Sequence, residues 1–138
     1  MNDRYLFRGK SPDSGWIHGF LCPPTYPGYI GKSWYIAVEN DYKYGYDGKL
    51  WCYEAIDPAT IGQCTGLRDK NGTLIFEGDI CQYSDLSSTH KYFVDWDRYQ
   101  FRFSSGRTGN GMFPINHLIS EIIGNIYDNP ELLEVETE

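Results

Sequence analysis

Short runs in which apolar and polar residues alternate constrain the fold of this chain more than any other feature. In "KYFVDW" (91–96), Tyr92, Val94 and Trp96 alternate with Phe93 and Asp95. A period of two places alternate side chains on opposite faces of a β-strand. Turn-forming residues separate these runs, and no long run repeats with the helical period of 3.6. The sequence therefore predicts an all-β fold.

The first half of the chain contains two predicted hairpins. The first joins "RYLFRGK" (4–10) to "GWIHGFL" (15–21). The second joins "SWYIAVE" (33–39) to "KLWCYEA" (49–55) around a loop that ends in Asp-Gly, a strong turn signal. The following stretch, "DPATIGQ" (57–63), is predicted to be a turn or one short helical turn.

The densest stretch of turn signals is "TGLRDKNGTLIFEGDI" (65–80). Asp69–Gly72 reads as a tight turn, because Asn and Gly tolerate positive φ. "TLIF" then reads as a strand that Gly78 breaks, and an isolated glycine in a strand indicates a bulge or a bend of the kind small barrels use at corners. We expect this stretch to form a turn, a strand and a barrel corner. "KYFVDW" and "YQFRF" (99–103) are predicted to form a further hairpin.

The C-terminal part predicts a turn or short helix in "PINHLIS" (114–120), a strand in "EIIGNIY" (121–127), and a helical turn with Asn129 as its cap and Pro130 first in the helix. We expect one domain over residues 1–138, which is long enough for a real core. Residues 1–59 would form an N-terminal β layer with an aromatic hairpin, 60–134 a small, strongly bent, partly open SH3-like barrel with its cap, and 135–138 a tail. This analogy of fold carries no function.

Charge and composition limit the classes of partner. The net charge of −7 opposes binding to phosphate backbones, so nucleic acid is an unfavoured partner. The first ten residues carry charges where a signal peptide needs an apolar core, and no apolar stretch reaches the roughly 20 residues of a membrane span. We therefore expect a cytoplasmic protein without a membrane anchor.

The cysteines do not have the spacing of a metal site. None of the four forms a Cys-x-x-Cys pair, so we expect no metal and no cofactor, and we interpret the cysteines as reduced, mostly buried small hydrophobes. The four residues are Cys22, Cys52, Cys64 and Cys81.

An unusual concentration of aromatic residues marks the second hairpin as the candidate interaction surface. Tyrosine offers a large contact area with a polar end, and it is common at protein interfaces. Two alternatives stay open: the rings pack against each other across strands, or they stack on nucleic-acid bases or sugars. The candidate residues are Trp34, Tyr42, Tyr44, Tyr46, Trp51 and Tyr53.

Two further sets of charged residues define weaker hypotheses. Carboxylates two residues apart on a strand share a face and could perform acid–base chemistry or hold Mg²⁺; the alternative is a solvated strand face and a bend that binds backbone amides. A nucleic-acid face would need the scattered cations to converge. The carboxylates are Glu77, Asp79, Asp95 and Asp97, and the cations are Arg68, Lys70, Lys91, Arg98, Arg102 and Arg107.

Three segments resemble the YopX family of phage and prophage proteins: "FRGK" (7–10), "IDPATIGQCTGLRDKNGTLIFEGDI" (56–80) and "EIIGNIYDNPELL" (121–133). The resemblance implies an origin in a phage or mobile element of a bacterial host and a mostly β fold, and it implies no activity. We therefore interpret the chain as a non-enzymatic protein-interaction module that acts on a phage or host protein, with self-association as one form. The alternatives are a nucleic-acid-binding barrel of phage replication or regulation, and an enzyme with an unrecognised carboxylate site.

Overall fold

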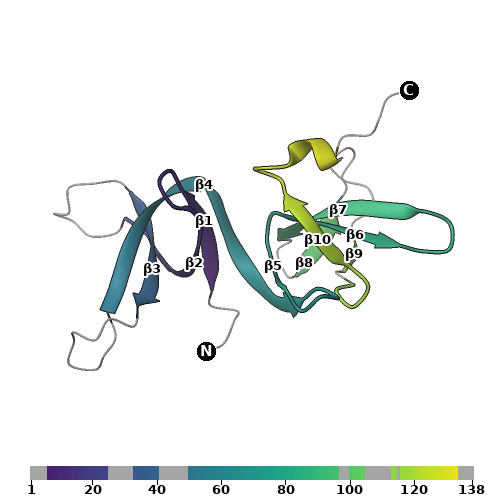
Figure 1. Ribbon diagram of the computed structural model, residues 1–138, viewed down its shortest axis with the longest axis horizontal. Coiled ribbons are helices and arrows are strands. Elements are labelled where there is room, and N and C mark those ends of the chain that lie inside the picture. The colour runs from purple at the N-terminus through teal and green to yellow at the C-terminus, as the bar shows by residue number, and fades with distance from the viewer. Residues whose placement is uncertain are drawn as a thin grey trace. The chain divides into compact units, whose positions relative to one another are not determined.

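The computed structural model describes residues 6–24, 33–40, 50–96, 100–104, 113–114 and 116–133, and for residues 39–40, 50–51 and 113–114 it describes the backbone alone. Its described elements are antiparallel strands and one 3₁₀ turn (Figure 1), which confirms the all-β prediction. They belong to two compact units, Met1–Gln63 and Cys64–Glu138. This division lies inside one long strand, close to the expected boundary between the 1–59 layer and the 60–134 core.

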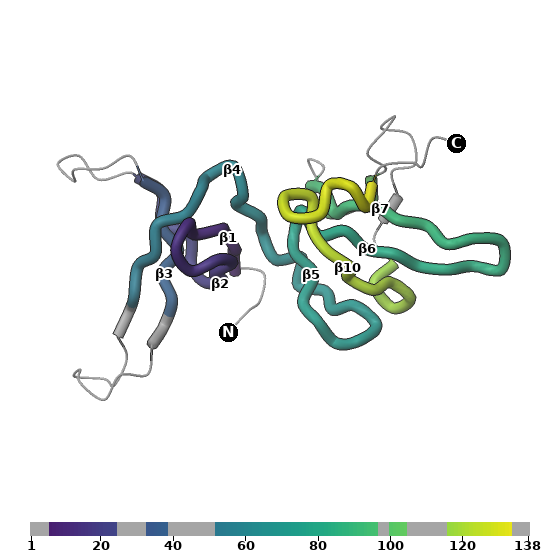
Figure 2. The backbone as a smooth tube through the Cα atoms, turned by 45° about the horizontal axis from the view of Figure 1, so that its top comes forward, coloured from purple at the N-terminus to yellow at the C-terminus, as the bar shows by residue number. Residues whose placement is uncertain are grey.

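The first unit is a ring of four strands (Figure 2). It contains β1 (Phe7–Ser11), β2 (Gly15–Cys22), β3 (Trp34–Asn40) and the part of β4 (Leu50–Arg68) that precedes Cys64. β1 pairs with β2, β2 with β3, and β3 with β4, and β4 then returns to pair with β1. Both predicted hairpins are confirmed, and the return pairing closes them into one ring.

Two glycines allow the ring to close tightly around Ile36 and Ile56, which are buried. A Cβ atom at Gly9 would lie 2.4 Å from Ile56 Cδ1, and one at Gly19 would lie 2.3 Å from the backbone oxygen of Ala37. Real Cβ atoms essentially never approach other atoms so closely. Because glycine has no side chain, Gly9 and Gly19 permit the strands to approach each other closely.

The prediction of a turn or helical turn at 57–63 is wrong, because these residues continue β4 and pair with β1. Lys10 pairs with Asp57 and Arg8 with Gly62, so one residue of β1 lies opposite a bulge at 58–61 of β4. The Thr60 hydroxyl holds this bulge: it accepts from the Lys10 amide (2.8 Å) and donates to the Asp57 carbonyl (2.6 Å). The turn-forming residues are present, but β1, a strand distant in the sequence, pairs with the backbone on both sides of the bulge.

The second unit contains a sheet with the order β10 (Glu121–Asn125), β6 (Asp79–Ser84), β7 (Thr89–Trp96), β8 (Phe101–Ser104) and β9 (Phe113–Pro114). The end of β4 also pairs with β5 (Leu74–Phe76). The 3₁₀ turn η2 (Pro130–Leu133) contacts β7. The predicted all-β, small barrel-like class of fold with a C-terminal helical turn is confirmed, and the pairing that closes a ring, β1 with β4, lies in the first unit, where the sequence had predicted a hairpin layer.

The core of the second unit lies on one face of this sheet and consists of Ile75, Cys81, Val94 and Phe103. Tyr92 packs against it, so the predicted common face of Tyr92 and Val94 is confirmed. Trp96, at the end of the same alternation, is partly exposed and packs edge-on against Phe101.

The predicted bend at Gly78 is present, with a φ of +94° that favours glycine. The Gly78 amide donates to the Val94 carbonyl, and its own carbonyl accepts from Ile126. The helical turn begins at Pro130 as predicted. The Asn129 side chain accepts from the Asn125 amide, so it connects the turn to the end of β10.

Candidate functional site

The register of β3 with β4 separates the aromatic residues of the candidate interaction surface. Trp34 pairs with Ile56, so it shares the face that carries the buried Ile36 and Ile56. Tyr53 pairs with Ala37 on the opposite face, where its side chain is 63% exposed. Trp51 pairs with Glu39 in the backbone register. Tyr42, Tyr44 and Tyr46 lie outside the described residues.

The face of Tyr53 continues across β3 and β2. Tyr35 pairs with Ala55 and with Cys22, and Phe20 pairs with Ala37, so Phe20, Tyr35 and Tyr53 lie on one face. Tyr35 and Phe20 are each partly exposed. Tyr35 belongs to the aromatic-rich second hairpin, whereas Phe20, on the neighbouring strand, was not among the candidates, although its alternation with Leu21 was available as a signal. We call Phe20, Tyr35 and Tyr53 the aromatic face.

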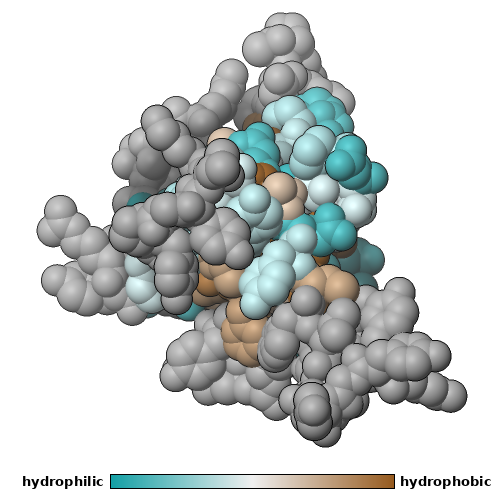
Figure 3. Space-filling model, turned by 90° about the vertical axis from the view of Figure 1, so that its left-hand side faces the viewer, coloured by the Kyte–Doolittle hydropathy of each residue, from teal (hydrophilic) through white to brown (hydrophobic). Residues whose placement is uncertain are grey.

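Farther along β2, Trp16 and His18 follow the same alternation as Phe20. The guanidinium of the buried Arg8 lies 4.7 Å from the centre of the Trp16 ring, within the range of a cation–π contact. Partial burial, reinforced by this guanidinium, lowers the pKa of His18. The first unit thus carries a buried cation against Trp16 and a histidine whose pKa lies below its ordinary value. In Figure 3, seen from the side of the first unit, hydrophobic atoms (brown) reach the surface among polar ones.

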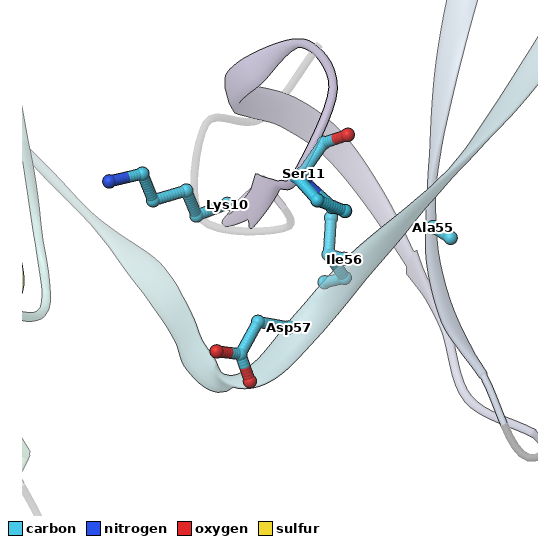
Figure 4. A pocket seen from close by; sticks show the side chains of 6 residues that line it. Lys10, Ser11, Ala55, Ile56 and Asp57 are labelled. Carbon is cyan, nitrogen blue, oxygen red and sulfur yellow. The ribbon is translucent and has the colours of Figure 1, made fainter.

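An open recess of about 360 Å³ lies where β1 meets the bend of β4. Pro12, Ala55 and Ile56 provide apolar walls, while Lys10 and Asp57 contribute opposite charges (Figure 4). The Asp57 carboxylate also accepts from the Ala59 amide at 3.0 Å, so one of its oxygens stabilises the bulge. The recess can admit a small polar molecule, and its carboxylate already serves the local fold.

The structure does not bring the described candidate carboxylates together. Ile80 pairs with Phe93, so alternation places Asp95 on the face of Ile80 and Asp79 on the other face. Asp79 is 2% exposed and accepts from the Phe76 amide at 2.7 Å. Asp95 contacts Arg102 at 3.4 Å and accepts from the Trp96 amide. Glu77 lies in the bend, and Asp97 lies outside the described residues.

The candidate cations are partly matched by neighbouring carboxylates. Lys70 lies 3.8 Å from Glu121, and Arg102 is the partner of Asp95. The Arg68 guanidinium donates to the Gly72 carbonyl. Lys91 is exposed on β7, while Arg98 and Arg107 lie outside the described residues. Pairing therefore lowers the net positive charge that this set would offer to phosphates.

Asp69 joins two segments of the second unit by hydrogen bonds, and this contact is called the clamp. The sequence predicted only the turn at this residue. Its side chain is buried, and it accepts from the amides of Asn71 and Thr73 (both 2.9 Å) and of Ile122 (3.0 Å). Burial raises the pKa of Asp69, but the amides of Ile122, Thr73 and Asn71, with Lys70 nearby, outweigh burial and leave the pKa below its ordinary value. The carboxylate thereby ties the 69–73 turn to the start of β10.

Further contacts strengthen the clamp. The Lys70 amide donates to the Ser120 carbonyl at 2.9 Å, and the Asn71 side chain donates to Glu121 at 3.4 Å. His117 Nδ1 lies 2.8 Å from the Arg68 carbonyl. The clamp, defined as residues 69–73 with 120–122, connects segments about fifty positions apart in the chain.

The tip of the β6–β7 hairpin contains a second polar network. Asp85 accepts from the amides of Ser87 and Ser88 and pairs with His90 Nε2 at 2.8 Å. The hydroxyl and amide of Ser87, the amide of Ser88 and the His90 ring hold the pKa of Asp85 well below its usual range. Tyr83 lies beside both His90 and Tyr92, with ring centres 5.1 Å and 5.8 Å away, and the His90 and Tyr92 rings are 6.2 Å apart. Among the described residues, no group of three or more His, Cys, Asp or Glu side chains is arranged to hold a metal ion.

Comparison with known proteins identifies the family. Residues 31–134, most of the chain, match the family described as "YopX protein". The chain belongs to the YopX family. No curated protein matches it. Among solved structures, the YopX chain is similar to the crystal structure of protein EF1440 from Enterococcus faecalis, with 22% sequence identity and a TM-score of 0.53. The similarity covers 94% of this chain and 97% of the other, and it shows a shared fold.

The clamp joins two of the three segments that resemble the YopX family. Asp69, Lys70 and Asn71 belong to the 56–80 segment, and they bind residues at the start of the 121–133 segment or directly before it. Gly78 and Ile126, one from each segment, are also hydrogen-bonded. The polar residues and glycines that are frequent in these YopX segments therefore hold the backbone in place.

Among the described residues there is no helix with the length and apolar character that crossing a membrane requires.

Proposed function

We propose that this YopX protein is a non-enzymatic protein-interaction module of phage or prophage origin that acts on a phage or host protein in the cytoplasm, and that the aromatic face of its first unit is the contact surface. The observation that carries the proposal is the exposure of Tyr53, which is 63% exposed on a sheet face shared with Phe20 and Tyr35. Aromatic residues supply much of the binding energy at protein interfaces, and an exposed aromatic patch usually marks a contact site.

The alternatives have weaker support. For an enzyme, the described carboxylates would have to converge, yet Asp79 and Asp95 follow opposite faces of the sheet and each binds a backbone amide. For a nucleic-acid reader, Lys70 and Arg102 would have to be available for phosphates, yet each contacts a carboxylate. Stacking readers combine aromatic rings with such cations, so a protein partner fits this surface better.

The experiment compares substitutions on the two faces of the β3–β4 hairpin. We expect Tyr53→Ser, and the combined substitution of Tyr42, Tyr44 and Tyr46 by Ser, to reduce self-association in sedimentation experiments or to abolish capture of a host protein. The thermal midpoint should change little, because an exposed ring contributes little to the core. Trp34→Ser on the opposite face is the matched control, and it should lower the thermal midpoint. If Tyr53→Ser unfolds the chain, or leaves both association and capture unchanged, the proposal is wrong.

A further inference from the structure

The Asn71–Gly72 peptide bond lies in an exposed turn, and hydrogen bonds to Asp69 and Glu121 hold this turn in place. The Gly72 amide donates to the Asp69 carbonyl at 2.9 Å, and Gly72 has a φ of +84°. The Asn71 amide binds the Asp69 carboxylate, and its side-chain nitrogen binds Glu121. A tight turn followed by a left-handed glycine is a common hairpin connection. Both partners of the Asn-Gly bond are therefore fixed by the clamp.

Asn-Gly bonds can undergo an intramolecular reaction that needs only water. The backbone nitrogen of the glycine loses its proton and attacks Cγ of the asparagine; an N–Cγ bond forms, the Cγ–Nδ2 bond breaks, and ammonia leaves. Water then opens the resulting succinimide at either carbonyl and gives aspartate or isoaspartate. Glycine favours this reaction because it has no side chain to obstruct the attack, and no oxidant or reductant is involved.

The clamp opposes the first step in two ways. Donation of the Gly72 N–H to Asp69 disfavours loss of the proton that precedes attack. The bond from Asn71 Nδ2 to Glu121 restrains the side chain that must turn toward Gly72. Reaction then requires a local opening of the turn, and local openings of hydrogen-bonded segments are minor states.

We propose that Asn71–Gly72 is a latent deamidation site that the clamp protects, and that its conversion opens the clamp. Conversion to aspartate replaces the amide donor to Glu121 by a carboxylate, so two negative charges repel each other where a hydrogen bond of 3.4 Å had been. An isoaspartate also adds a backbone atom inside the turn from which Asp69 reaches Ile122. Conversion therefore releases the start of β10.

The chain contains its own reference, because Asn110–Gly111 is a second Asn-Gly bond. The intact protein and the same protein in urea are incubated at mildly alkaline pH, and peptide mapping measures aspartate and isoaspartate at both positions. We expect Asn71 to convert at least about tenfold more slowly in the folded protein than in urea, since the open state is minor. Equal rates for Asn71 in the two conditions would overturn the proposal.

Two variants test the role of the clamp. Glu121→Ala removes the partner of the Asn71 side chain and should accelerate conversion of Asn71 severalfold, without a change at Asn110. Glu131→Ala, an exposed carboxylate in η2, should change neither rate. An unchanged Asn71 rate in Glu121→Ala, or an equal rise at Asn110, contradicts local protection. In the purified converted protein, amide hydrogen exchange at 120–123 should increase; unchanged exchange contradicts the opening of the clamp.

Discussion

Replacing Asp69 by alanine tests the clamp quantitatively. The substitution deprives the amides of Asn71, Thr73 and Ile122 of a buried, charged acceptor. A hydrogen bond to a charged group contributes about 1.5–3 kcal/mol, and an unsatisfied buried amide costs about 1–3 kcal/mol. Water can replace the carboxylate at the two turn amides, so the amide of Ile122 dominates. We expect the free energy of unfolding of the second unit to fall by about 3 kcal/mol.

Urea denaturation, followed by hydrogen exchange in peptides from β6 and from β3, measures this effect in each unit. We expect the loss in β6 of the second unit, with β3 of the first unit unchanged. Asp85→Ala is the matched control, because Asp85 also accepts from backbone amides but lies in an exposed tip. A small change in Asp69→Ala, equal to that in Asp85→Ala, would refute the reasoning that burial makes the Asp69 bonds strong.

Asp69 should also make stability depend on pH. Its folded pKa lies below the ordinary value of 3.8, so its contribution is complete above that value and is lost as the pH falls from 3.8 through the folded pKa. Asp69→Asn should therefore flatten the acid limb of the stability curve; an acid limb identical to that of the unmodified chain would contradict this assignment.

Three further predictions concern other parts of the molecule. Gly19→Ala should destabilise the first unit by about 1–3 kcal/mol in thermal unfolding, since the new Cβ would collide with the Ala37 carbonyl; a stability equal to that of His18→Ala would contradict the tight ring. In the folded protein, a thiol reagent should modify Cys22 and Cys52 before the buried Cys64 and Cys81, and all four should react after unfolding; early reaction at Cys64 would contradict the packing. Duplex DNA should bind more weakly than about micromolar at physiological salt, where non-specific binding already lies at roughly 10⁻⁴–10⁻⁶ M, and tight, salt-sensitive binding would favour the nucleic-acid alternative.

Local patterns in the sequence predicted most of the strands. Alternation in 91–96 identified β7 and its buried face, because the two-residue period is a property of the strand itself. The Asn71–Gly72 and Gly78 signals identified the turn and the bend, because the φ values there favour glycine. These features depend on residues that are neighbours in the chain, so the sequence alone predicts them.

Long-range pairing was not predictable in the same way. The residues at 57–63 became strand because β1, about fifty positions earlier, pairs with them, and no local pattern indicates that partner. The same reason explains why Asp69 was read as a turn residue, although it binds Ile122. At the candidate site, the aromatic density of the second hairpin was visible, but the register that separates Trp34 from Tyr53 was not.

The proposed interaction through the aromatic face is tested most directly by photo-crosslinking in the bacterial host, with a photoreactive amino acid at one position at a time. Positions 53 and 55 lie on the exposed face of β4, and position 54 between them follows the opposite face. The account predicts that reagents at Tyr53 and Ala55 capture the same protein, whether a second copy of this chain or another partner, while a reagent at Glu54 does not. No adduct at 53 and 55, or an equal yield at 54, would contradict it.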